Sequence, residues 1–139
     1  MILVTGGSGV MGRVFIQALH AKGCRIRLFT LPADPAMAVL KDFVDDVRFV
    51  DIANRADLRG VCDGIDTVYH LAAIIITNSE KQFQRINIDG TRHVIEEAKT
   101  ASVKHLVYIS SASVVYSQPT PYSLSKRTAE ELVKSSGLS

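Results

Sequence analysis

The segment Thr5-Gly6-Gly7-Ser8-Gly9-Val10-Met11-Gly12 decides the fold of this 139-residue chain. It follows the short apolar run Ile2–Thr5, which predicts a strand, and it leads into Val10–Lys22, which predicts a helix. Glycines allow a tight turn between the two and let backbone N–H groups approach a pyrophosphate. This context predicts a dinucleotide-binding turn, and the alternative is a glycine turn that is needed only for packing.

Predicted strands and helices alternate along the rest of the chain. Further strands are expected at Cys24–Thr30, Val47–Val50, Thr67–Leu71 and His105–Ser110. Helices are expected at Val10–Lys22 with Val14, Ala18 and Ala21 on one face, in a short segment ending near Val44, at Arg55–Cys62, at Gln82–Thr100 and at Ser123–Lys134. Strands that alternate with helices and are apolar on both faces form parallel sheets covered on both sides. We therefore expect an α/β fold, a doubly wound Rossmann-type sheet in strand order 3-2-1-4-5.

Composition limits the classes of function. Sixteen basic and fourteen acidic residues give a net charge of +2, too little for a nucleic-acid or membrane-surface partner. The longest apolar run, Leu71–Ile76, is far shorter than a membrane span, and the N-terminus lacks the pattern of a signal peptide, so a cytoplasmic protein is expected. Cys24 and Cys62 fit no disulfide framework and are expected to be buried thiols. The scattered histidines predict no metal site, and no linker divides residues 1–139 into two domains.

Tyr122 and Lys126 form the second chemical feature of the sequence. They lie four residues apart at the start of the helix expected at Ser123–Lys134, and on a helix this spacing puts the phenol and the ammonium on one face. A cation beside a phenol favours the phenolate, which makes proton exchange with an alcohol or carbonyl feasible beside a nicotinamide. Alone, this spacing is common on helix surfaces, but together with the glycine turn it indicates a catalytic pair.

Three serines lie at or just after the end of the last predicted strand: Ser110, Ser111 and Ser113. The carboxyl ends of parallel strands face the ligand crevice of a doubly wound sheet, so a hydroxyl here could orient the reacting oxygen. We favour Ser111 for this role, and the alternative is that the serines cap a turn.

Together these residues resemble the extended branch of the short-chain dehydrogenase/reductase superfamily, the NAD-dependent epimerase/dehydratase family. Thr5-Gly6-x-x-Gly9-x-x-Gly12 is similar to its cofactor turn, and Asp51-Ile52 to its adenine-contacting pair. His70-Leu71-Ala72-Ala73 resembles its segment beside the nicotinamide, and Asn87-x-x-Gly90-Thr91 its helix motif that steadies the active site.

The resemblance implies a site. Ser111, Tyr122 and Lys126 take the positions of the family's catalytic serine, tyrosine and lysine. The residues implied to contact the cofactor are Gly6, Ser8, Gly9, Val10, Met11, Gly12, Thr30, Asp51, Ile52, Leu71, Ala72, Ala73, Asn87, Tyr122 and Lys126. Tyr122 would exchange the hydroxyl proton, Lys126 would hold the nicotinamide ribose and favour the Tyr122 phenolate, and Ser111 would bind the substrate oxygen.

The resemblance also implies partners. Family substrates include nucleotide-linked sugars, sterol-like alcohols and other ketones, and family dimers pair the helices that correspond to Gln82–Thr100 and Ser123–Lys134. Members continue well beyond the length of this chain, so residues 1–139 would be an NAD(P)-binding Rossmann domain without the substrate-binding lobe. A non-catalytic dinucleotide-binding module or an inactive fragment is the alternative function.

Several choices stay open at the level of sequence. The second strand ends without the acid that would hold an adenosine 2′-hydroxyl, Asp34 lies beyond a proline at a distance that counts against it, and Arg13 could reach a phosphate. The sequence therefore does not decide between NAD and NADP. Asp51 could instead be a helix N-cap. His70 is expected to be structural, because one imidazole at a strand end usually satisfies a local hydrogen bond.

Overall fold

Five parallel strands form a single sheet in the order β3-β2-β1-β4-β5 in the computed structural model, which describes residues 1–139. The strands are β1 (Ile2–Thr5), β2 (Ile26–Thr30), β3 (Asp46–Phe49), β4 (Thr67–His70) and β5 (His105–Tyr108). The helices are α1 (Val10–Ala21), α2 (Met37–Leu40), α3 (Glu80–Gln82), α4 (Gly90–Thr100) and α5 (Pro121–Lys134). The predicted fold class and strand order are confirmed.

Short helical segments of other types connect these elements. Three are 3₁₀ turns, namely η1 (Lys41–Phe43), η2 (Arg55–Leu58) and η4 (Ala112–Val115). The fourth, η3 (Phe83–Asp89), is a π-helix that joins α3 to α4. The predicted helix Gln82–Thr100 is therefore one continuous rod that changes its winding midway. None of the helices has the length and apolar composition that crossing a membrane requires.

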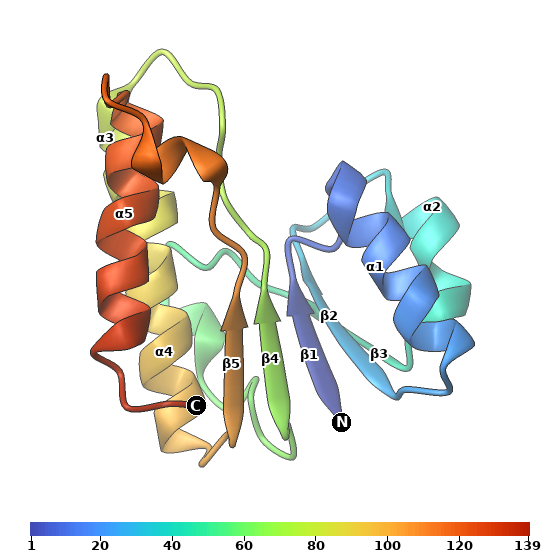
Figure 1. Cartoon of the computed structure of the whole chain (residues 1–139). Coiled ribbons are helices and arrows are strands. Elements are labelled where there is room, and N and C mark those ends of the chain that lie inside the picture. The colour runs from blue at the N-terminus through green and yellow to red at the C-terminus, as the bar shows by residue number, and fades with distance from the viewer.

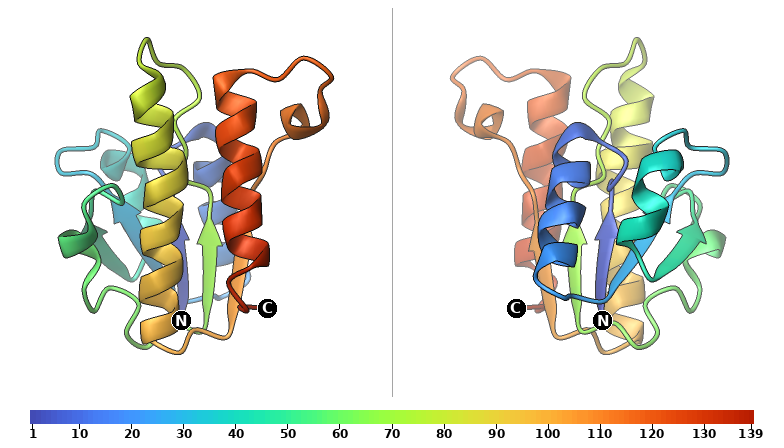
Figure 2. Two further views of the ribbon diagram at one scale, coloured as in Figure 1. Left: turned by 90° about the vertical axis from the view of Figure 1, so that its left-hand side faces the viewer. Right: turned by 90° about the vertical axis from the view of Figure 1, so that its right-hand side faces the viewer.

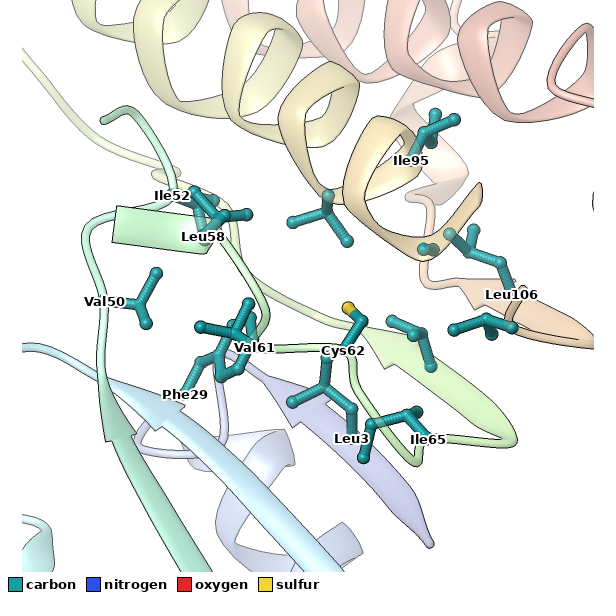
Figure 3. Close-up of a cluster of buried hydrophobic side chains, with 14 residues drawn as sticks. Leu3, Phe29, Val50, Ile52, Leu58, Val61, Cys62, Ile65, Ile95 and Leu106 are labelled. Atoms are coloured by element: carbon teal, nitrogen blue, oxygen red, sulfur yellow. The ribbon is translucent and has the colours of Figure 1, made fainter. Parts of the chain in front are cut away.

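Helices cover both faces of the sheet. Figure 1 shows α1 and α2 against one face and α3, α4 and α5 against the other. Because successive side chains of a strand point to opposite faces, Leu3 packs into the core beneath α4 and Val4 into the core beneath α1. Figure 3 shows the larger of these cores, where side chains from the sheet, η2 and α4 surround Cys62.

The predicted helix is present as α1, but the face that carries Val14, Ala18 and Ala21 is exposed. Gly12, Ile16 and Leu19 form the buried face. Gly12 occupies the contact position because only a residue without a side chain fits against the turn before the helix. The spacing of apolar residues in the sequence therefore does not reveal the buried face of α1, because the first residue of that face is a glycine.

The free cysteines lie in different environments. Cys62 is fully buried, as predicted, but Cys24 is only half-buried at the start of β2. Burial raises the pKa of the Cys62 thiol to about 12, so this thiol stays protonated at neutral pH.

Candidate functional site

A cavity of about 510 Å³ opens at the carboxyl ends of the strands, above the turn between β1 and α1. In a doubly wound sheet this is the place where the strand order reverses and where ligands bind. The cavity is lined by twelve of the residues expected to contact a cofactor: Gly6, Ser8, Gly9, Val10, Met11, Gly12, Thr30, Asp51, Ile52, Leu71, Ala72 and Ala73. Asn87, Ser111, Tyr122 and Lys126 do not line it.

Two glycines of the turn are required by the packing of the protein itself. Gly6 has a φ of +70°, and a Cβ there would lie 2.5 Å from the backbone nitrogen of Ala72. A Cβ on Gly12 would collide with the carbonyl oxygen of Gly6. Gly6 therefore lets the turn approach the loop after β4, and Gly12 lets α1 pack against the turn, whatever the cavity holds.

Gly9 is different, because nothing in the protein excludes a side chain there. A Cβ on Gly9 would meet only the Gly6 carbonyl oxygen at 3.4 Å, which is an ordinary contact, and its φ of −66° suits any residue. The space beside Gly9 belongs to the cavity. The absence of a side chain here therefore keeps open a surface that a ligand can approach closely.

The first turn of α1 has the properties of an anion site. Its N-cap, Gly9, supplies no side-chain hydrogen bond, and the first turn carries no acidic residue. The first N–H groups of a helix have no partner within the helix, and the helix dipole favours a negative charge beside them. A pyrophosphate seated over Gly9 would satisfy these donors, so the residues present fit a dinucleotide.

Asp51 stands at the far side of the cavity, where β3 runs into the following loop. Its carboxylate accepts a hydrogen bond from the Ala53 N–H at 3.0 Å and forms an ion pair with Arg85 at 2.7 Å. The N-cap of η2 is Asn54, so the alternative reading of Asp51 as a helix cap is wrong. Arg85 was not predicted to contact Asp51. The sequence shows it only as a charged residue in the predicted helix Gln82–Thr100, which does not identify its partner.

His70 is fully buried at the end of β4 and occupies the middle of a hydrogen-bonded chain. The Thr91 hydroxyl donates to the Asn87 carbonyl oxygen at 2.6 Å, so it accepts from Nε2–H of His70 at 2.9 Å. Nδ1 of His70 then accepts from the Thr5 hydroxyl at 2.6 Å. Burial, and to a smaller extent the Lys126 charge, lower the pKa of His70 to about 3.

Both imidazole nitrogens of His70 are therefore used by the protein, and the ring is neutral at physiological pH. The predicted structural role of His70 agrees with this geometry. The Thr5 hydroxyl also accepts from the Ala72 N–H at 3.2 Å. The same series of hydrogen bonds therefore connects the end of β1 to the loop that lines the cavity.

The π-helix places Asn87 where it holds that loop and α5 together. Its amide accepts from the Ile74 N–H at 2.8 Å and donates to the Ile74 carbonyl oxygen at 3.0 Å. It also donates to the Ser125 hydroxyl at 2.9 Å, and this hydroxyl donates to the carbonyl oxygen of Tyr122 at 2.7 Å. Asn87 and Thr91 are each only 1% exposed, so neither is an ordinary helix-surface residue.

Lys126 is a buried cation, 2% exposed, at the carboxyl end of β5. Its Nζ donates to the Ile109 carbonyl oxygen at 2.7 Å and lies 4.1 Å from the centre of the Tyr108 ring. Burial lowers the pKa of Lys126 to about 8, although Glu130 acts in the opposite direction. An ammonium has three donors, so Lys126 keeps donor capacity for a ligand hydroxyl next to Ile109, which lines the cavity.

Tyr122 lies on the first turn of α5, one turn before Lys126, as the sequence predicts. Its ring is half-buried, and its centre is 6.2 Å from that of Phe83 on η3. The helix begins earlier than predicted because Thr120 and Ser123 form a capping box and Pro121 occupies the first helical position. A second phenol, Tyr108, is a poorer acid, because burial and the nearby Tyr122 raise its pKa above the ordinary value.

Ser111 caps the short helix η4. Its hydroxyl accepts from the Ser113 N–H at 3.2 Å and lies 2.9 Å from the Ser113 hydroxyl. The alternative prediction, that these serines cap a turn, therefore agrees with the hydrogen bonds that Ser111 makes. The neighbouring Ser110 hydroxyl is buried without a hydrogen-bond partner.

Comparison with known proteins finds relatives over most of the chain. Residues 3–120 match the model of the 3-beta hydroxysteroid dehydrogenase/isomerase family. The chain is 35% identical over 127 residues to a 3-beta-hydroxysteroid dehydrogenase of Mycolicibacterium neoaurum, which covers 82% of the chain and 32% of that protein. It is 33% identical over 114 residues to the human sterol-4-alpha-carboxylate 3-dehydrogenase, decarboxylating, which covers 81% of the chain and 29% of that protein.

Solved structures show the same architecture with NAD bound. A short-chain dehydrogenase/reductase superfamily protein from Agrobacterium tumefaciens superposes with a TM-score of 0.82 at 28% identity, over 96% of this chain and 44% of that one. The UDP-glucuronic acid 4-epimerase of Bacillus cereus superposes with a TM-score of 0.82 at 26% identity, over 97% and 52%. The chain thus spans about a third of the length of the first two curated relatives and about half of these solved chains.

Proposed function

Because this chain belongs to the 3-beta hydroxysteroid dehydrogenase/isomerase family, we propose that it binds NAD or NADP in the cavity above α1. Residues 1–139 would be the NAD(P)-binding Rossmann domain of an oxidoreductase or an epimerase/dehydratase that uses Ser111, Tyr122 and Lys126. One observation carries the proposal: the open surface at Gly9 faces an uncapped helix N-terminus that fits a pyrophosphate.

The remaining cofactor contacts follow from the shape of the cavity. Asp51 and Ile52 would bind the adenine end, and Leu71, Ala72 and Ala73 would lie along the nicotinamide side. Asn87 acts indirectly, because its side chain holds the backbone of Ile74, a cavity residue. When bound, the nicotinamide ring supplies the hydride chemistry that no amino-acid side chain provides.

The chain's own residues would manage the proton. Tyr122 would give or take it at the phenol oxygen, and the Lys126 ammonium one turn away would favour the phenolate electrostatically. Lys126 is already held by Ile109, so it would bind the nicotinamide ribose with little loss of side-chain freedom. Ser111 would orient the substrate oxygen from its position at the start of η4.

We propose an alcohol or ketone on an apolar skeleton, such as a sterol-like molecule, as the substrate class. Ile75 lines the cavity and is 64% exposed, and the adjacent Ile76 is 87% exposed. Curated relatives are named for steroid and sterol dehydrogenation. A nucleotide sugar is the alternative, since one of the solved relatives is a UDP-glucuronic acid 4-epimerase.

We also propose a homodimer that pairs α4 and α5 of each copy. Figure 2 shows these helices side by side on one face of the molecule, and Leu124 on α5 is 48% exposed. Light scattering at micromolar concentration tests the assembly, and a monomer there would overturn it.

Titration of the chain with NADH and with NADPH, followed by nicotinamide fluorescence, tests the cofactor site. Saturable binding of at least one reduced cofactor is expected. The second measurement is hydride transfer from the reduced cofactor to the carbonyl carbon of a sterol ketone, which becomes an alcohol as its oxygen takes up a proton, in the protein that carries the whole family architecture, with Tyr122→Phe as the variant. Loss of exchange with retained NADH binding supports the acid–base role of Tyr122. Binding without exchange in the unaltered protein would indicate a non-catalytic dinucleotide-binding module.

A further inference from the structure

The aromatic ring of Tyr108 lies against the ammonium of Lys126. The Nζ atom of Lys126 is 4.1 Å from the centre of this ring, which is well within the range of about 6 Å over which an aromatic face attracts a cation. Tyr108 is the last residue of β5, and Lys126 lies on α5. The contact therefore joins the sheet to the helix that carries the proposed catalytic pair.

The hydroxyl of Tyr108 does not account for a tyrosine at this position. It is buried and has no hydrogen-bond partner, which costs free energy relative to a hydroxyl in water. Burial and the nearby Tyr122 also raise the pKa of this phenol, so it keeps its proton and is not an acid or a base near neutral pH. The ring is therefore the part of Tyr108 that interacts with the site.

No carboxylate neutralises the Lys126 ammonium. Its hydrogen bond goes to the carbonyl oxygen of Ile109 at 2.7 Å, and none of the ion pairs in the chain includes it. Glu130, one turn further along α5, pairs with Lys134 at 3.7 Å and favours the charge of Lys126 less than burial opposes it. A carboxylate would cancel the charge of the ammonium, whereas an aromatic face attracts it and leaves the charge in place.

The ring of Tyr108 has a rigid neighbour on β4. The register of the sheet pairs Tyr108 with His70, and the centres of their rings are 5.7 Å apart. Both nitrogens of His70 are hydrogen-bonded, to Thr5 and to Thr91, so the orientation of the imidazole is fixed. His70 is also neutral near pH 7, because burial lowers its pKa to about 3, and so it adds no positive charge beside Lys126.

From these contacts we propose that Tyr108 is a positioning residue for Lys126, whose ring holds the ammonium by a cation–π contact and leaves its positive charge available to the cofactor and to Tyr122. The inference rests on the proposed role of Lys126. Lysine carries its charge on a flexible four-carbon stem, which a single hydrogen bond to Ile109 would leave mobile. The ring and the carbonyl oxygen together hold the ammonium in one place.

NMR of the chain with isotope-labelled lysine ε-methylene groups tests the contact. The Lys126 signal, identified by its loss in Lys126→Arg, should lie at higher field than that of the exposed Lys134, because of the ring current of Tyr108. Tyr108→Phe keeps the ring and should keep this signal and the midpoint of the Lys126 titration. Tyr108→Leu should lower that midpoint by about half a pH unit or more, because a cation–π contact stabilises the charged form.

Fluorescence titration of the same variants with NADH and with NADPH tests the consequence for binding. For the cofactor that binds more tightly, Tyr108→Leu should weaken the affinity about fivefold, which equals about 1 kcal/mol and agrees with the strength of such contacts. Tyr108→Phe should bind as the unaltered chain does. Tyr116→Leu replaces an exposed aromatic residue at the end of η4 and is the matched control, which should change neither the affinity nor the Lys126 titration.

The outcomes separate the two proposals. If the unaltered chain binds neither cofactor, the proposed function fails, and the NMR titration still decides whether the ring holds Lys126. If a cofactor binds and Tyr108→Leu leaves either the midpoint or the affinity unchanged, the role of Tyr108 is overturned while the cofactor site stands. Equal losses in Tyr108→Phe and Tyr108→Leu would also overturn it, because the hydroxyl would then be the group that matters. Thermal unfolding checks each variant, and if Tyr108→Leu does not fold, Tyr108→Met fills more of the space without an aromatic face and takes its place.

Discussion

The Nζ atom of Lys126 lies 2.7 Å from the carbonyl oxygen of Ile109, so a buried ammonium connects α5 to the segment that follows β5. The lysine is 2% exposed, and burial lowers its pKa to about 8. Burial therefore disfavours the charged form of Lys126. With a pKa close to neutral pH, its protonation can respond to a ribose hydroxyl or a phenolate beside it.

The lowered pKa of Lys126 predicts a specific pH dependence of stability. Between pH 8 and about 10.5 the unfolded chain holds this proton and the folded chain does not, so the free energy of unfolding rises with pH. Between pH 8 and 9 we expect a rise of up to about 1.4 kcal/mol in the unaltered chain. Lys126→Met should remove it, as urea unfolding at several pH values would show. Cys62 acts in the opposite direction, because burial keeps its thiol protonated in the folded chain while a thiol in the unfolded chain begins to lose its proton near about pH 8.5. The difference in slope between the unaltered chain and Lys126→Met therefore isolates the contribution of the lysine. A variant that keeps the full slope would contradict the assignment.

Gly9 and Gly12 offer a matched pair of substitutions. Gly9→Ala should leave the free energy of unfolding within about 0.5 kcal/mol, because the new methyl meets only an ordinary contact. It should weaken NADH binding at least about tenfold, since the methyl occupies the surface that the pyrophosphate must approach. Calorimetric titration and thermal unfolding measure both effects on one sample. Undiminished binding would mean that the phosphates do not lie over Gly9.

Gly12→Ala should behave in the opposite way. Its methyl collides with the backbone of Gly6 and Gly7, where no flexible side chain can move aside. We expect a loss of about 1–3 kcal/mol in the free energy of unfolding, as for other overpacked sites, whether or not a cofactor is present. Normal stability of this variant would show that the turn is looser than the structure indicates.

His70 predicts a loss of stability at mildly acidic pH. An unfolded histidine takes up a proton below about pH 6.5, whereas His70 in the folded chain does so only near its pKa of about 3. Protonation therefore favours the unfolded state, and the free energy of unfolding should fall by up to about 1.4 kcal/mol per pH unit below 6.5. His70→Gln should flatten the profile between pH 5 and 6.5, a range in which most carboxylates are still ionised. The exposed His20→Gln is the control and should leave the slope unchanged.

The Ser125 hydroxyl connects Asn87 on the π-helix to the backbone of Tyr122, and this connection is expected to contribute to stability. Ser125→Ala removes the hydroxyl that connects the Asn87 amide to the carbonyl oxygen of Tyr122. Loss of one buried hydrogen-bond partner should lower the free energy of unfolding by about 1–3 kcal/mol. Ser135→Ala, which removes an exposed hydroxyl at the end of α5, should cost less. Equal effects of the two changes in chemical denaturation would contradict the importance of the buried connection.

Much of the fold was predictable because its signals are local. The glycine turn and the alternation of apolar strands with helices are sufficient to predict the strand order, and the register then brings the ends of β1 and β4 together at Thr5 and His70. The same topology predicts that residues from separate loops come together in the wall of the cavity. Most of these residues lie in the loops that directly follow β1, β2, β3 and β4, where topology determines their position.

The features that escaped prediction depend on contacts that sequence spacing does not encode. A π-helix at Phe83–Asp89 keeps an apolar pattern close to that of an α-helix, so periodicity could not reveal that Asn87 turns inward. Asp34 returns to the sheet only because Ala33 adopts a left-handed conformation that alanine rarely takes. The buried stripe of α1 begins at Gly12, which carries no hydrophobic signal at all.

The two thiols differ in accessibility, so only one of them is expected to react with a labelling reagent. Cys62 is sealed in the core and resists deprotonation, whereas Cys24 is partly accessible and lies just before β2, at the amino ends of the strands. A maleimide dye should therefore attach at Cys24 alone, at the end of the sheet opposite the cavity. Labelling at this single site would place one reporter dye on the chain without engineered mutations.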